Sequence, residues 1–347
     1  MVDIPFGDYI LLRQNGSRRL IMAFSGIGCE RGKFSYFQTF AASPHDILLL
    51  NSPGNGWFFG GIPLSADSGD MSLQSTLAFL HALAAEYDEV ILFGGSMGGY
   101  GALLYGSFFP NAHVLSLAPE IYPGIRQGHF VAHSKSSDLP LALSALFLRN
   151  RSFAPHILVG EKMESDLFNF GEIISDRIYA IRNGYHNLAP MLIAVFGRID
   201  TVMDHLVAGT LGKALQPYVG QMYHHPELSA HMYYMRLGRV PLSRSIAYFH
   251  ALSPDSYVRA YLAVRIAAEL AKQNDVAQAL DFAKLAKEAN PGDLEAHALY
   301  DRLHLKQFAV LPDPTYQDHL RSYDLVLPLY KSAVDELTAL HSQAAPA

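Results

Sequence analysis

Cysteine is almost missing from this sequence: Cys29 is the only one in 347 residues, so no disulfide bond can form within the chain. A lone free thiol is consistent with a reducing compartment. The first residues carry neither the basic start nor the apolar stretch of a signal peptide. No uninterrupted apolar run is long enough to cross a bilayer. We therefore expect a soluble, cytoplasmic protein without a membrane span.

Charge is also scarce, since Asp, Glu, Lys and Arg make up 17% of the residues while 50% are hydrophobic. This composition is typical of a globular protein with a large core. The net charge of −6 and the lack of a long basic run argue against nucleic acid as a partner. Phosphate-binding loops and dinucleotide fingerprints are missing too. His224, His225 and His231 lack the spacing of a metal site, so we expect neither metal nor cofactor.

Glycine, in contrast, gathers at Gly94-Gly95-Ser96-Met97-Gly98-Gly99, between an apolar run and a helix-forming stretch. The pattern G-x-S-x-G is that of a nucleophile elbow, a sharp turn between strand and helix that holds a serine hydroxyl above a sheet. The residues two before and two after the serine pack against each other, so both must be nearly free of side chain. The alternative is a glycine-rich turn with an incidental serine.

At these residues the sequence resembles the α/β-hydrolase superfamily. The string Gly-Gly-Ser-Met-Gly-Gly-Tyr-Gly-Ala-Leu, at 94–103, is similar to the elbow of esterase members such as the S-formylglutathione hydrolase and feruloyl esterase group. The likeness to that group is too short to indicate a substrate. The superfamily resemblance implies an α/β-hydrolase fold, with a mostly parallel sheet and helices on both faces, and a catalytic triad in the chain order serine, acid, histidine.

Strand and helix patterns alternate along the first 209 residues, as a parallel sheet with crossover helices requires. Tyr9–Arg13 and Arg19–Phe24 flank an Asn-Gly turn, which predicts a hairpin. Asp46–Leu50 is a continuous apolar run and predicts a buried parallel strand. Further strands are expected at 90–93, 114–117, 156–160 and 177–182. We assign residues 1–209 to an α/β-hydrolase domain.

The predicted nucleophile is Ser96, which needs a base and a carboxylate to activate it. His186 follows the last predicted strand in a glycine-containing loop, so we expect it to be the base. The alternative is a histidine in a surface loop. The resemblance places the acid just after the strand at 156–160, where Glu161, Glu164 and Asp166 lie. Asp166 is favoured because aspartate is the commoner acid and the loop gives it reach; Glu161 is the alternative.

Two backbone amides are predicted to bind the oxyanion that forms on the substrate. One is Met97, at the N-terminus of the helix after the elbow. In α/β-hydrolases the other comes from a loop that often reads H-G-x-G. Here the corresponding stretch is Ser25-Gly26-Ile27-Gly28, with serine in place of histidine. We predict the Ile27 amide, with Gly26 or Gly28 as alternatives; the loop could also be a plain flexible turn.

The loop at 51–61 is rich in glycine and aromatic residues and follows a predicted parallel strand, where α/β sheets bind ligands. Trp57 and Phe58 are therefore candidates to line an acyl or aryl pocket, and packing of the loop onto the core is the equal alternative. The irregular stretch at 119–151 stands where hydrolases of this kind place a lid. Within it we predict a helix at 140–149, and expect its two histidines, His129 and His133, to face solvent or substrate.

From residue 210 the pattern changes to one of helices, with almost no strand signal up to residue 347. Residues 260–293 resemble one tetratricopeptide repeat, with small residues and a proline in the positions of that motif at Ala267, Ala279, Ala286 and Pro291. Ala283 departs from it, because a bulky aromatic is usual there. A second helix pair is predicted at 294–305 and near 325–340. Since one repeat is too few for a solenoid, we expect a helical domain packed on the hydrolase domain. It is a candidate surface for a protein partner or self-association.

These observations support three functional hypotheses. The first is a serine hydrolase that cleaves a small-molecule carboxylic ester through an acyl-enzyme. The second is an acyltransferase with the same triad, in which a sugar or other alcohol intercepts the acyl group and a dry site excludes water. The third is a catalytically inactive hydrolase fold that acts as a protein-binding scaffold. An elbow with an acid and a histidine in the right order weighs against the third.

Overall fold

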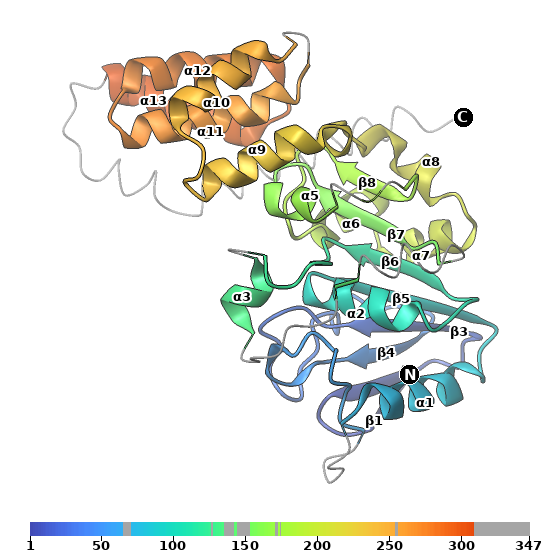
Figure 1. Ribbon diagram of the computed structural model, residues 1–347. Coiled ribbons are helices and arrows are strands. Elements are labelled where there is room, and N and C mark those ends of the chain that lie inside the picture. The colour runs from blue at the N-terminus through green and yellow to red at the C-terminus, as the bar shows by residue number, and fades with distance from the viewer. Residues whose placement is uncertain are drawn as a thin grey trace, which may run out of the picture. The chain divides into compact units, whose positions relative to one another are not determined.

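The structure is a computed structural model that describes residues 1–64, 71–125, 128–134, 142–143, 153–170, 173, 175–253 and 256–308. By its internal contacts the chain divides into two compact units, Met1–Pro226 and Glu227–Ala347 (Figure 1). In the described part of the chain, no helix combines the length and the hydropathy that crossing a bilayer requires.

The first unit is built on one sheet with the strand order β1-β2-β4-β3-β5-β6-β7-β8 (Figure 1). Pairs β1–β2 and β2–β4 are antiparallel, and the remaining pairs are parallel. The strands are β1 Val2–Pro5, β2 Ile10–Gln14, β3 Arg19–Phe24, β4 Asp46–Leu50, β5 Glu89–Gly95, β6 His113–Leu117, β7 His156–Gly160 and β8 Ile178–Ile181. The predicted α/β class with a mostly parallel sheet is confirmed.

The predicted hairpin between β2 and β3 is wrong, because β4 lies between these two strands. The chain bends at Gly16, and Asp46 at the start of β4 stabilises this bend. The Asp46 carboxylate accepts the backbone N–H groups of Asn15 (2.7 Å) and Ser17 (3.0 Å). The apolar β4, buried along its whole length, is better accommodated inside the sheet than at its edge.

Helices cover both faces of the sheet. They are α1 Leu73–Ala84, α2 Met97–Gly106, α3 His129–His133, α5 Glu164–Phe170, α6 Ala189–Phe196, α7 Ile199–Val207 and α8 Leu211–Leu215, together with short 3₁₀ turns at Pro53–Asn55, Gln216–Tyr218 and Met222–His224. On one face, α6 and α7 pack against alternate residues of the central strands, such as Ile91 and Phe93. On the other, α2 packs against β3, where the rings of Phe24 and Tyr105 stack with centroids 5.5 Å apart. The predicted helix at 140–149 lies largely outside the described residues.

Residues 210–226, which the sequence pattern assigned to the helical region, pack on the sheet of the first unit. Leu211 and Leu215 belong to the same hydrophobic cluster as Ile181 of β8. Backbone hydrogen bonds join Arg182 N–H to Tyr218 O (2.8 Å) and Gly220 N–H to Ala180 O (2.7 Å). This segment therefore extends the first unit beyond the boundary expected at 209/210, because it covers the outer strand β8.

The described part of the second unit is helical. Its elements are α9 Pro226–Arg236, which starts at the last residue of the first unit, α10 Leu242–Ala251, α11 Arg259–Lys272, α12 Val276–Ala289 and α13 Leu294–Phe308. Helices α11 and α12 pack against each other, and Ala267, Ala279 and Ala286 on these helices are fully buried. The Asp275 side chain caps α12 by accepting the Gln278 N–H (3.1 Å). The tetratricopeptide resemblance stays a prediction, and the helix expected near 325–340 falls outside the described residues.

Candidate active site

Ser96 stands at the sharp turn between β5 and α2, at the carboxyl edge of the parallel strands. Its backbone has φ 57° and ψ −124°, a conformation that non-glycine residues rarely adopt. A Cβ added to Gly94 would lie 2.2 Å from the carbonyl oxygen of Gly98, and one added to Gly98 would lie 2.0 Å from the carbonyl oxygen of Phe24. The two glycines therefore allow strand, elbow and helix to approach at backbone distance, as the sequence pattern predicts.

The helix after the elbow begins with unpaired amides. Its first internal hydrogen bond runs from Tyr100 N–H to Ser96 O (3.0 Å), so the N–H groups of Met97, Gly98 and Gly99 have no acceptor among the described residues. The positive end of the helix dipole adds to their attraction for an anion. The Met97 amide directly follows Ser96 and is therefore available to a negative charge that develops beside the serine.

The loop at 25–28 contains one unpaired amide flanked by two paired ones. Gly26 N–H donates to Ser35 Oγ (3.0 Å) and Gly28 N–H donates to Asn55 Oδ1 (3.0 Å). Ile27 N–H, between them, has no acceptor in the described part of the chain. A Cβ on Gly26 would lie 3.6 Å from the Gly95 carbonyl oxygen, so the loop lies against the elbow. Of the three amides considered from sequence, only that of Ile27 remains available to a ligand.

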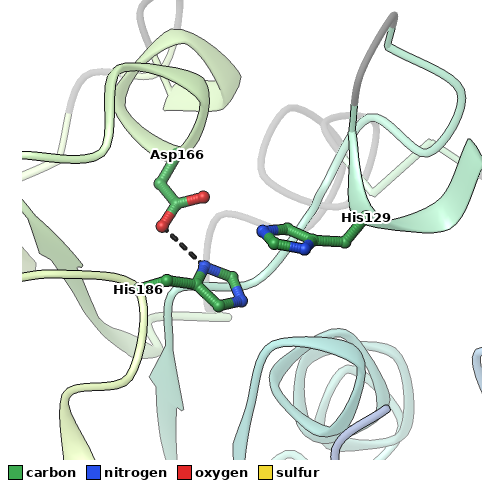
Figure 2. A group of neighbouring side chains, drawn as sticks. All are labelled: His129, Asp166 and His186. Atoms are coloured by element: carbon green, nitrogen blue, oxygen red, sulfur yellow. Dashed lines mark hydrogen bonds and ion pairs between the residues drawn. The ribbon is translucent and has the colours of Figure 1, made fainter. Parts of the chain in front are cut away.

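His186 and Asp166 meet at the ends of β8 and β7. His186 Nδ1 lies 2.8 Å from Asp166 Oδ2, and Figure 2 shows this hydrogen bond. Asp166 is in the first turn of α5 and is buried. The loop before His186 packs on the end of β7: Lys162 N–H donates to Gly184 O (3.0 Å), and a Cβ on Gly160 would lie 2.4 Å from that oxygen. This backbone contact brings the histidine to the acid.

Glu161, the alternative acid, has a different partner. Its carboxylate is fully buried, and Oε1 accepts the Met222 backbone N–H (2.8 Å). Gly220 lies so close that an added Cβ would come within 2.4 Å of both carboxylate oxygens. Glu161 therefore anchors the segment that follows β8. Of the two candidate acids, Asp166 is the one hydrogen-bonded to His186.

The hydrogen bond to Asp166 defines the state of the His186 ring. A carboxylate oxygen only accepts, so the neutral ring carries its proton on Nδ1 and has a lone pair on Nε2. Nε2 is buried and has no hydrogen-bond partner among the described residues, Ser96 Oγ included. Burial disfavours the charged ring, but the charge and hydrogen bond of Asp166, with the charge of Glu120, raise the pKa of His186 above its ordinary value. In the neutral state Nε2 is free to act as a base.

The ring of a second histidine, His129, covers one face of the His186 ring. The ring of His129, at the start of α3, stacks on the ring of His186 with centroids 4.0 Å apart and planes 27° apart (Figure 2). The sequence pattern placed His129 in a lid and expected it to face solvent or substrate; its contact with His186 was not foreseen. No periodicity indicates this contact, because it joins loops that follow two different strands.

Glu120 holds the start of α3. Its Oε2 accepts the Phe130 N–H (2.7 Å), and an added Cβ on Gly128 would lie 2.0 Å from its Oε1. Oε1 is buried and has no hydrogen-bond partner in the part of the chain that the structure describes. Burial is the main reason why the pKa of this carboxyl rises to about 7, and the charge of Asp166 adds to the rise. The signal that could have found Glu120 is its position just after β6, at the edge where such sheets bind ligands.

His129, Asp166 and His186 also form a group whose ligand atoms all lie within 4.8 Å of one another. A metal ion must lie near the plane of each imidazole that binds it, at about 2.0–2.1 Å for zinc. The two rings are stacked, so their planes run side by side and do not converge on one point. Asp166 already occupies Nδ1 of His186. The arrangement seen here suits proton transfer and does not suit shared metal ligation.

Trp57 and Phe58 are fully buried. The Trp57 ring meets Phe130 of α3 edge to face with centroids 5.0 Å apart, and Phe58 meets Phe24 in the same way at 5.2 Å. Both side chains pack the loop after β4 onto its surroundings and present no surface to a substrate in this structure. Their assignment to a substrate pocket stays a prediction.

A cavity of about 390 Å³ lies elsewhere in the first unit, at the other end of the strands. Its lining includes His113 and His156, which begin β6 and β7, together with Tyr179 and Lys213. Because Ser96, Asp166 and His186 follow the carboxyl ends of their strands, this cavity is separate from the candidate site.

No protein-family model matches the chain, and no curated protein matches it. Among solved structures, the capsule O-acetyltransferase of Neisseria meningitidis serogroup A is 17% identical over 53% of this chain and 87% of its own, with a TM-score of 0.38. An esterase of Pyrococcus furiosus is 16% identical over 63% of this chain and 92% of its own, with a TM-score of 0.35. The monoacylglycerol lipase of Paleococcus ferrophilus is 15% identical over 59% of this chain and 98% of its own, with a TM-score of 0.34. At these values the likeness assigns neither a family nor an activity.

Proposed function

We propose that the first unit is a serine hydrolase that cleaves carboxylic esters, with Ser96 as nucleophile, His186 as base and Asp166 as the acid that orients the base. The observation that carries the proposal is the His186–Asp166 hydrogen bond at the strand edge where the strained Ser96 elbow stands. An orienting acid, a base with a lone pair on Nε2 and a serine on a strained turn together fit the requirements of nucleophilic catalysis.

The reaction follows from these positions. Ser96 Oγ attacks the acyl carbon while His186 Nε2 accepts the hydroxyl proton, which forms the Oγ–C bond and a tetrahedral oxyanion. The amides of Met97 and Ile27 donate to that oxyanion. The ester C–O bond breaks, and His186 returns the proton to the leaving alcohol. Water, deprotonated by His186, then releases the carboxylic acid and restores Ser96. The Ser96–His186 hydrogen bond is not made in this structure, and catalytic hydrogen bonds of this kind often tighten only in the complex with substrate.

One observation favours acyl transfer as the second candidate. Nε2 of His186 is buried, and the ring lies beneath His129. A base shielded in this way is poorly placed to activate bulk water. An acyl-enzyme would then persist until the hydroxyl of a sugar or another alcohol reaches it.

Hydrolysis of p-nitrophenyl esters of increasing acyl length tests both candidates. We compare wild type with Ser96→Ala and His186→Ala. Ser107→Ala, at the far end of α2, and His205→Ala, on α7, are matched controls. Steady turnover that only the first two variants lose supports the hydrolase. A single burst that resumes when an alcohol is added supports the transferase. No burst, no turnover and no labelling of Ser96 by a fluorophosphonate would overturn both.

A further inference from the structure

Asn55 lies in a strained loop beside the candidate site. It ends the 3₁₀ turn Pro53–Asn55 after β4 and has φ 57°, and Trp57 and Phe58 also have positive φ, 52° and 60°. Such backbone persists in non-glycine residues only where the surroundings hold it. Here Phe58 N–H donates to Ser52 Oγ (3.2 Å), and Tyr105 OH donates to the Phe58 carbonyl oxygen (3.1 Å). The loop is therefore a fixed platform for the Asn55 side chain.

The amide of Asn55 bridges two other segments. Its Oδ1 accepts the Gly28 N–H (3.0 Å), and its Nδ2 donates to the His133 carbonyl oxygen (3.2 Å). The partners determine the orientation of the amide, because a backbone N–H needs an acceptor and a carbonyl needs a donor. An asparagine satisfies both at once, and it tolerates a left-handed backbone better than most residues. No other uncharged side chain of this length offers an acceptor and a donor in these positions.

One of the two segments that Asn55 joins carries a proposed oxyanion donor, and the other carries the helix that covers the proposed base. Gly28 directly follows Ile27, whose N–H is the unpaired amide of the 25–28 loop. His133 ends α3, and His129 begins it with its ring on His186. Asn55 thus restrains both the peptide next to a proposed oxyanion donor and the helix that covers the proposed base.

We propose that Asn55 is a positioning residue with two roles. Its Oδ1 holds the Ile27 amide in place for the oxyanion, and its Nδ2, through the hydrogen bond to the His133 carbonyl, holds α3 over His186. The proposal rests on the function proposed above. Oδ1 acts on catalysis because a donor that is displaced by a fraction of an ångström no longer meets the oxyanion well. Nδ2 holds the end of α3, which covers His186, so loss of its hydrogen bond to the His133 carbonyl loosens that helix.

Two variants separate the two hydrogen bonds. Asn55→Gly removes both, in a residue for which the left-handed backbone is unstrained. Asn55→Asp retains an acceptor for Gly28 but faces the His133 carbonyl with a carboxylate oxygen, which repels it. Asn274→Gly is the matched control, because Asn274 also has a left-handed backbone, φ 63°, in the turn between α11 and α12 of the second unit.

The measurements are kcat and KM for a p-nitrophenyl ester, referred to active sites titrated with a fluorophosphonate, and acrylamide quenching of tryptophan fluorescence. Trp57 is the only tryptophan and packs against Phe130 of α3, so its quenching reports how firmly α3 is seated. Referring kcat to titrated sites removes the effect of protein that has not folded.

We expect Asn55→Gly to lower kcat about 10- to 100-fold with KM changed less than about twofold, as for loss of a contact made in the transition state. Asn55→Asp should retain kcat within about threefold, and both variants should increase quenching relative to Asn274→Gly. Unchanged kcat in Asn55→Gly, or an equal loss in Asn55→Asp, would overturn the role of Oδ1. Unchanged quenching in both Asn55 variants would overturn the role of Nδ2 in holding α3 over His186. A wild type that neither turns over nor reacts with the fluorophosphonate would overturn the proposed function, and the role of Asn55 with it.

Discussion

His129 lies face to face on His186, with ring centroids 4.0 Å apart, and so covers the group that the proposed reaction uses as its base. The two rings come from different parts of the sheet edge, one from α3 after β6 and the other from the loop after β8. His186 Nε2 is buried in this arrangement. Since the His129 ring lies on one face of His186, α3 limits the access of water to the base from that side.

Replacing His129 with alanine should let water reach the acyl-enzyme. We expect hydrolysis of the isolated acetyl-enzyme to become severalfold faster, because Nε2 of His186 becomes accessible, while the rate of acylation changes little. Mass spectrometry of the acetylated protein over time gives the rate. Val131→Ala is the control, since Val131 is on the same helix and is 55% exposed. Equal hydrolysis rates in His129→Ala and Val131→Ala would show that the stacked ring does not exclude water.

Replacing Asp166 with asparagine should lower kcat by about 10⁴-fold, because the amide no longer fixes the ring with its proton on Nδ1. The acid limb of the pH profile should also shift. His186 acts as a base only when neutral, and Asp166 raises its pKa, so the wild type loses activity as the pH falls through that raised value. Without the carboxylate the limb moves to lower pH. The measurement is kcat/KM from pH 5 to pH 9.

Glu161→Gln is the comparison for that experiment. The Glu161 carboxylate accepts the Met222 backbone N–H, while Asp166 makes the hydrogen bond to His186, so Glu161→Gln should lower the melting temperature and leave the pH profile in place. A loss of kcat larger in Glu161→Gln than in Asp166→Asn would reverse the assignment of the acid.

Glu120→Gln should stabilise the protein at neutral and alkaline pH. Burial raises the pKa of this carboxyl from its ordinary value of 4.5 to about 7 in the folded protein. Between these values the unfolded chain loses the proton while the folded protein keeps it, so stability falls as pH rises. The glutamine retains an oxygen for the Phe130 N–H and never ionises.

The difference in melting temperature between Glu120→Gln and wild type therefore grows from pH 4.5 to about pH 7 and is constant above. Scanning calorimetry across this range measures it, and the groups that do not interact with Glu120 cancel because they titrate alike in both proteins. A difference that is constant at every pH would show that Glu120 ionises in the folded protein as it does in the unfolded chain.

Local patterns in the sequence predict much of the sheet and the elbow. The β7 strand is a short apolar run followed by glycine, and its bounds match the prediction. The elbow can be predicted equally well from the sequence, because glycines at 94 and 98 are required by contacts with the backbone a few residues away or on the adjacent strand. Where the cause of a structure lies within one segment, the residues of that segment are enough to predict it.

The errors have a different cause. The chain does bend at Asn15-Gly16, but β4 separates the strands on either side of the bend, and nothing local to it specifies that insertion. In the same way, the contacts of Glu120 with α3 and of Asn55 with Gly28 and His133 join segments 10 to 78 residues apart. Such contacts depend on the assembled sheet edge, where neighbouring strands bring unrelated loops together.

Replacing Gly98 with alanine tests how strictly the elbow depends on backbone contact. The new Cβ would lie 2.0 Å from the Phe24 carbonyl oxygen and 2.9 Å from that of Ser25, both of which belong to the backbone at the end of β3. Relief requires α2 to move away from β3. We expect a loss of about 3 kcal/mol or more in the free energy of unfolding, at the upper end of overpacking costs, measured by urea denaturation.

Gly60→Ala is the control, because its new Cβ would meet only the flexible end of Met71 at 3.8 Å and should cost little. Equal stability of the two variants would mean that the elbow relaxes freely, and that the glycine pattern at 94 and 98 has a cause other than this contact.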